Sequence, residues 1–97
     1  MPTEFKRDER GYLEWLDANP HGYVINTTRS MSPSYMVLHR ATCPTISQYN
    51  QMCREGGFTE RDYIKVCALT HEELRDWVRG HGRPDGSFSS EGCYCQT

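Results

Sequence analysis

The chain has 97 residues, a net charge of −2 at pH 7 and a hydrophobic fraction of 36%. This length suits one domain with a small core, and the apolar fraction is below that of ordinary globular chains, so a metal ion or a crosslink would add needed stability. The slightly acidic balance excludes a protein covered in positive charge, and nucleic-acid binding would therefore require a local basic patch.

The N-terminal segment is charged throughout. It lacks the apolar centre of a signal peptide, and no later segment approaches the roughly 20 apolar residues that span a bilayer. We therefore expect a cytoplasmic chain with no membrane partner. Residues 1–8 are predicted to be a flexible charged arm, followed by a single domain over residues 9–97.

The first half of the chain predicts a helix and a hairpin. Apolar residues at helical spacing predict a helix over residues 8–19, which Pro20 ends. Two short segments rich in β-branched and aromatic residues, 23–27 and 35–39, predict strands joined as an antiparallel hairpin. Alternation along the second strand places His39 on the face opposite to that of Met36 and Leu38.

The second half predicts two more helices and one strand. Cys43 precedes a proline, which favours a helix N-terminus there, and apolar spacing extends that helix over residues 44–54. A strand follows at 62–67, and Thr70 begins a capped helix that ends near residue 79. We expect an α+β fold in which a small antiparallel sheet packs with two or three helices. The predicted core consists of Trp15, Leu16, Val24, Met36, Leu38, Ile64, Val66, Leu74, Trp77 and Val78.

Five cysteines, an odd number, favour a metal site or a reactive thiol over disulfides in such a chain. His39 and Cys43 flank the predicted bend between a strand and a helix, and two thiols with Cys-x-Cys spacing lie on one side of an extended segment. One histidine and three thiolates form a closed tetrahedral zinc site. The predicted ligands of Zn²⁺ are therefore His39, Cys43, Cys93 and Cys95, with Cys67 as an alternative ligand, and zinc is expected to stabilise the fold.

Other interpretations of these side chains remain open. Cys53 fits a buried core thiol, and His39 could be a hydrogen-bonded core histidine. Cys43 at a helix N-terminus could instead be a nucleophile activated by the helix dipole and by the nearby imidazole. Because no third orienting residue is evident, a thiol-dependent enzyme using Cys43 is the less favoured interpretation, and no catalytic residue is assigned.

Residues 38–44, the capped helix over 70–79 and the pair Cys93 and Cys95 together resemble the small zinc module at the N-terminus of the Ada phosphotriester-repair protein. The departures are the Cys-x-Cys spacing, where the family has Cys-x-x-Cys, and the long loop before it. Residues 22–26 with 38–43 are also similar to zinc modules associated with restriction-type nucleases. These resemblances imply a zinc-stabilised module in a DNA-related setting, with DNA or a protein such as a nuclease as the partner.

Basic and aromatic residues on the predicted strands suggest a surface for nucleic acid. Phosphate contacts are expected from Arg29, Arg40 and Lys65, and three tyrosines could stack on bases: Tyr23, Tyr35 and Tyr63. The alternative is that these charges are merely solvated, because acidic residues interrupt every basic run. We therefore expect a monomeric, non-catalytic recognition module for DNA, with a protein-binding adaptor or inhibitor as the rival function.

Overall fold

The computed structural model describes residues 2–49 and 54–91 of the chain. The elements are β1 (Thr3–Phe5), α1 (Glu9–Ala18), β2 (Tyr23–Thr28), β3 (Met36–Arg40), α2 (Pro44–Ser47), β4 (Tyr63–Ala68), α3 (His71–Arg79) and β5 (Ser90–Glu91). The strands form one sheet in the order β1-β4-β2-β3-β5. No helix in these ranges is long and apolar enough to cross a bilayer.

The fold is α+β, as predicted, but its sheet is mixed and not purely antiparallel. β2 pairs in antiparallel fashion with both β3 and β4, so the predicted hairpin is confirmed. β5 pairs in parallel with β3, with Val37 opposite Ser90 and Leu38 opposite Glu91. The fifth strand lies where the sequence predicted only a loop, because two residues are too few to show an alternating pattern.

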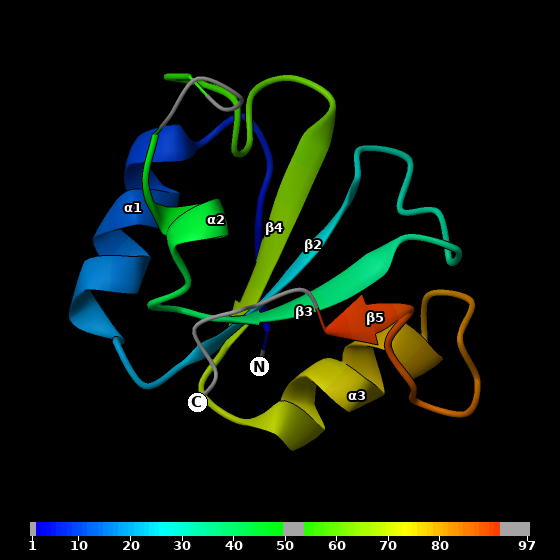
Figure 1. Cartoon of the computed structure of the whole chain (residues 1–97). Helices are drawn as coiled ribbons and strands as arrows, with labels where there is room; N and C mark the ends of the chain where they lie inside the picture. The colour runs from blue at the N-terminus through cyan, green and yellow to red at the C-terminus, as the bar shows by residue number, and fades with distance from the viewer. Residues whose placement is uncertain (1, 50–53, 92–97) are drawn as a thin grey trace.

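The sheet is the middle of three layers, with α1 and α2 on one face and α3 on the other (Figure 1). Adjacent residues of β2 serve opposite cores: Val24 packs with α1 and α2, and Ile25 packs with α3. The central strands are therefore apolar on both sides, as covered sheets generally are. Every predicted core residue is buried except Trp15, which is partly buried.

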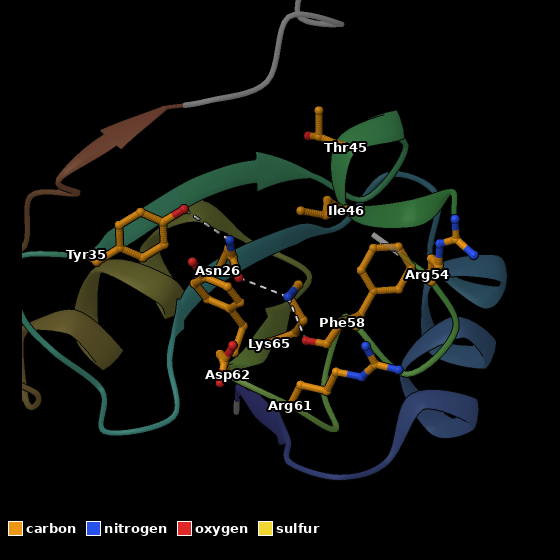
Figure 2. A pocket seen from close by; sticks show the side chains of 11 residues that line it. Asn26, Tyr35, Thr45, Ile46, Arg54, Phe58, Arg61, Asp62 and Lys65 are labelled. Atoms are coloured by element: carbon orange, nitrogen blue, oxygen red, sulfur yellow. Dashed lines mark hydrogen bonds between the residues drawn. The ribbon is translucent and has the colours of Figure 1, made fainter. Parts of the chain in front are cut away.

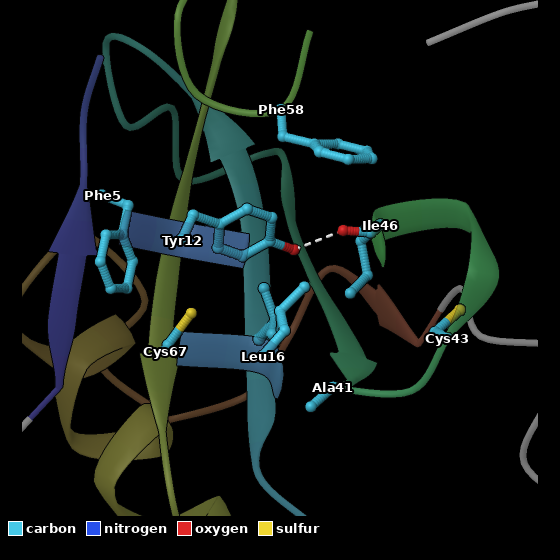
Figure 3. Close-up of a cluster of buried hydrophobic side chains, with 9 residues drawn as sticks. Phe5, Tyr12, Leu16, Ala41, Cys43, Ile46, Phe58 and Cys67 are labelled. Carbon is cyan, nitrogen blue, oxygen red and sulfur yellow. Dashed lines mark hydrogen bonds between the residues drawn. The ribbon is translucent and has the colours of Figure 1, made fainter. Parts of the chain in front are cut away.

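The core between the sheet and α1 is largely aromatic. Tyr12 is fully buried between the rings of Phe5 and Phe58, at centroid distances of 5.9 Å and 5.7 Å. The Tyr12 hydroxyl donates a 2.6 Å hydrogen bond to the backbone oxygen of Ile46 in α2 (Figure 3). This bond joins the two helices of that layer.

The N-terminal segment includes a strand that the sequence analysis missed. β1 pairs with β4, and the Trp77 indole of α3 donates a 2.9 Å hydrogen bond to a carboxylate oxygen of Glu4. Residues 3–5 are thus part of the sheet, whereas residues 1–8 were expected to form a flexible arm. A strand of only three residues, one of them charged, carries no local signal in the sequence.

The central helix is much shorter than predicted. The backbone of Gln48 is already extended, so the helix predicted over 44–54 ends at Ser47. The Ser47 hydroxyl donates to the backbone oxygen of Cys43, a local bond that competes with helix continuation. Tyr49, which lies within the range predicted as helix, instead stacks on Phe58 at a centroid distance of 5.0 Å.

Candidate functional site

A pocket of about 350 Å³ opens on the α2 side of the sheet, where β2 ends and where β3 and β4 begin (Figure 2). Its walls come from α2, from the 54–62 segment and from the strand ends. Chain segments distant in sequence therefore meet at one place, and the pocket mixes aromatic, amide and cationic side chains. Those lining side chains are Asn26, Tyr35, Thr45, Ile46, Arg54, Phe58, Arg61, Asp62, Tyr63 and Lys65.

Lys65 forms the polar floor of the pocket. Its side chain is only 2% exposed, and its ammonium donates to the Asn26 side-chain oxygen at 2.9 Å and to the Phe58 backbone oxygen at 2.7 Å. The register of β2 with β4 places Asn26 directly opposite Lys65, which explains the first bond. The ammonium also lies within 6.0 Å of the ring centroids of Tyr12, Phe58 and Tyr63. Lys65 therefore holds a charge at the base of the pocket without lying at the surface.

Glu9, in α1, binds the segment around Phe58, which forms one wall of the pocket. Its carboxylate accepts hydrogen bonds from the backbone N–H groups of Phe58 and Thr59 at 3.1 Å and 2.7 Å, and from the Tyr49 hydroxyl at 2.9 Å. Burial by itself raises the pKa of Glu9, but the donors at Phe58, Thr59 and Tyr49 outweigh it and hold the pKa below its usual value. The loop around Phe58 is thus fixed by an ionised carboxylate.

One side of the pocket is a pair of tyrosines. Tyr35 and Tyr63 are 38% and 37% exposed, and their ring centroids are 5.8 Å apart with the planes tilted by 46°. The Asn26 amide nitrogen lies 3.4 Å from the Tyr35 hydroxyl, a long hydrogen bond. The two rings touch each other, so they form one aromatic wall with an exposed face.

The rim of the pocket is positively charged. Arg54 and Arg61 are exposed, and among the described residues neither guanidinium forms an ion pair. With Lys65 they make three cations against the single carboxylate of Asp62, which leaves the lining with a net charge of three minus one, or +2. The pocket is therefore a local basic site on a chain of net charge −2.

The structure does not bring together the three residues predicted to contact nucleic acid. Arg29 donates through its guanidinium to the backbone oxygens of Arg61 and Thr59 at 2.6 Å and 3.2 Å. Arg40 is exposed, but it lies opposite Tyr23 at the other end of β2 from Arg29. Lys65 is the member of the set that lines the pocket.

Two of the four predicted zinc ligands lie in the described part of the chain. His39 is 5% exposed, and its buried Nδ1 atom has no hydrogen-bond partner there. Burial, with the positive charge of Lys65, lowers the pKa of His39 to about 4, so its imidazole is neutral at pH 7. Cys43 is 1% exposed and precedes α2, with its sulfur 3.0 Å from the Thr45 hydroxyl.

The other two predicted ligands, Cys93 and Cys95, lie outside the described residues, as does Cys53. Residues 2–49 and 54–91 contain no group of three or more histidine, cysteine or acidic side chains placed to hold a metal ion. The part of the site that is described thus consists of a neutral imidazole with an unpaired nitrogen and one buried thiol. Both are chemically suited to Zn²⁺.

Cys67, the alternative ligand, is not brought to His39. Both residues pair with Val24, from opposite sides, so two strand spacings of about 10 Å in total separate them. Figure 3 also shows the sulfur atoms of Cys67 and Cys43 on opposite sides of the buried cluster. Burial raises the pKa of the Cys67 thiol, as expected for a thiol in the core.

The position of Cys43 gives no support to a thiol-dependent enzyme. The thiol is almost fully buried, so a substrate does not reach it in this conformation. The helix that follows has only four residues, and a helix so short has a weak dipole.

Sequence reasoning missed Asn26, Phe58 and Glu9 as parts of the site. Asn26 and Lys65 each interrupt an apolar strand with a polar side chain, and that interruption was an available signal. Phe58 and Glu9 gave none, because their roles depend on contacts across about 50 residues of chain.

A comparison of the chain with protein-family models, with curated proteins and with solved structures found no significant match to any of them.

Proposed function

We propose that this chain is a small, zinc-stabilised, non-catalytic recognition module that binds nucleic acid. The observation that carries the proposal is the pocket, which combines an exposed aromatic wall with two arginines that form no ion pair in the described part of the chain. Arginines bind phosphates, and aromatic rings stack on bases.

The chemistry of the pocket favours single-stranded nucleic acid. Stacking requires an exposed face of a base, which a continuous duplex does not offer. Tyr35 and Tyr63 present such a surface in the same pocket as Arg54 and Arg61. The cations also attract a polyanion to this one place, although the whole chain repels it weakly.

Zinc has a structural role in this proposal. The support is the buried, unpartnered Nδ1 of His39 together with the thiol of Cys43, to which Cys93 and Cys95 would add the remaining ligands. A closed site of this composition stabilises a small domain, and it leaves no open position for catalysis.

Binding of a short single-stranded oligonucleotide, measured at about 50 and 200 mM salt beside the matching duplex, tests the proposed function. The full chain should prefer the single strand, and its affinity should fall as salt rises. Removing one phosphate contact with Arg61→Gln should lower the slope of log affinity against log salt by about 0.7. The matched control Arg10→Gln removes the same charge from the exposed face of α1 and should leave the slope nearly unchanged.

The absence of salt-dependent binding to either form would contradict the proposal and favour a protein-binding adaptor. Equal effects of Arg10→Gln and Arg61→Gln would show that net charge, and not the pocket, controls binding.

A further inference from the structure

We infer that the pocket holds one unstacked nucleotide of the bound strand, with its base against the Tyr35 and Tyr63 rings and its phosphate at Arg54 and Arg61. This inference rests on the proposed function and specifies which part of the nucleic acid enters the protein.

The size of the pocket favours a single nucleotide. Its volume of about 350 Å³ is at the lower end of the roughly 300–1,000 Å³ found for small-ligand pockets. A base within a duplex has its pairing partner beside it and its neighbours above and below. A pocket of this volume has no room for them, so the nucleotide that enters must be unpaired and unstacked.

The Asn26 amide, beside Lys65 at the floor of the pocket, has a fixed orientation. The Asn26 side-chain oxygen accepts from the Lys65 ammonium at 2.9 Å, and a lysine can only donate. This bond fixes the orientation of the amide, so its nitrogen must point the other way, toward Tyr35. One amide N–H donates to the Tyr35 hydroxyl, and the other can donate to an acceptor on the edge of a base stacked on the aromatic wall (Figure 2).

The charges of the rim orient the nucleotide. Arg54 and Arg61 lie on the 54–62 side of the pocket, across from Tyr35 (Figure 2). A base on the tyrosine wall directs its phosphate to the opposite rim, where the two guanidinium groups are exposed. Asp62 repels a phosphate, which leaves the arginines as the favourable place for it.

The experiment compares three duplexes that differ at one position: fully paired, with one bulged nucleotide, and with a bulged abasic unit. The full chain should bind the bulged nucleotide about tenfold more tightly than either of the other two. Tyr35→Ala should remove this preference, whereas Tyr35→Phe keeps the ring and should retain it. The urea midpoint of each variant shows whether it has kept its fold.

The outcomes separate the two proposals. Salt-dependent binding with equal affinity for all three duplexes would overturn the single-nucleotide inference and leave the proposed function standing. No binding to any of them, nor to the single strand, would overturn both. A free nucleoside monophosphate that binds as tightly as the bulged duplex would show that the pocket takes a small molecule, and this would contradict recognition of a strand.

Discussion

The peptide group that joins Phe58 to Thr59 lies between two buried charged side chains. Its N–H, from Thr59, donates to the Glu9 carboxylate, and its C=O, from Phe58, accepts from the Lys65 ammonium. The peptide dipole is therefore aligned with both charges. A buried charge without such partners is strongly unfavourable, so each of the two depends on this loop being in place. The same bonds position the wall of the candidate pocket.

Replacing Glu9 with glutamine should destabilise the protein by about 2–3 kcal/mol at pH 7, because an amide offers only one acceptor oxygen to the N–H donors of Phe58 and Thr59. The measurement is urea unfolding at pH 7 and pH 3. The folded-state pKa of Glu9 lies below the unfolded value of 4.5, so its stabilisation is present above that value and is lost as pH falls through the folded pKa. The difference between wild type and Glu9→Gln should therefore shrink toward pH 3.

Glu14→Gln is the matched control, since that carboxylate pairs with Arg10 only at the exposed surface of α1. It should change the free energy of unfolding by less than about 1 kcal/mol. A Glu9→Gln protein as stable as wild type at pH 7 would show that the buried carboxylate is not needed to hold the loop.

At the scale of elements, β5 brings the C-terminal end of the described chain beside the predicted zinc ligands. Glu91 pairs with Leu38, the residue that precedes His39. Cys93, a predicted ligand that lies outside the described residues, follows Glu91 by two residues in the sequence. The parallel pairing of β5 with β3 therefore places the last described residue beside the strand end that carries His39.

The zinc proposal predicts about one zinc ion per chain in the purified protein, measured by elemental analysis. Cys95→Ser should lose the metal and lower the unfolding midpoint, because binding to the folded state alone stabilises it. Cys53→Ser is the matched control: it also removes one thiol, and it should keep the metal. Folded wild-type protein without metal, or equal loss from both variants, would rule out the proposed ligand set.

The elements with a repeating pattern could be predicted, and those without one could not. The apolar stripe of α3 and its Thr70 cap are local features, so that helix was predicted within one residue. β1 and β5 are strands because they pair with β4 and β3. A strand of two or three residues is too short for such pairing to produce a recognisable sequence pattern. The helix expected over 44–54 ends at Ser47. Tyr49 contacts Phe58 and Glu9, which are distant from a helical stripe and could not be read from local spacing.

For the whole molecule, the sheet is a shared wall between two cores. The site depends on this arrangement, since Asn26 and Lys65 come from strands 39 residues apart and the pocket wall comes from a third segment. The sequence showed polar residues within apolar strands but could not show that they face each other. Register, which depends on the whole sheet, decides that.

The three-layer arrangement predicts that the two cores unfold together but tolerate small changes independently. Ile46→Val trims the core on the α2 side, and Ile64→Val trims the core on the α3 side. Each should lower the free energy of unfolding by about 0.5–1.5 kcal/mol, and the double variant should show their sum within about 0.5 kcal/mol.

The measurement is urea unfolding, monitored both by tryptophan fluorescence and by far-UV circular dichroism. The fluorescence covers both faces of the sheet, because Trp15 lies on the α1 side and Trp77 on the α3 side. The two signals should give one coincident transition in every variant, since each core shares the strands of the other and neither can persist without the sheet. Separate transitions would mean that one layer unfolds before the other. A coupling well above 0.5 kcal/mol would mean that the sheet transmits packing changes between its faces.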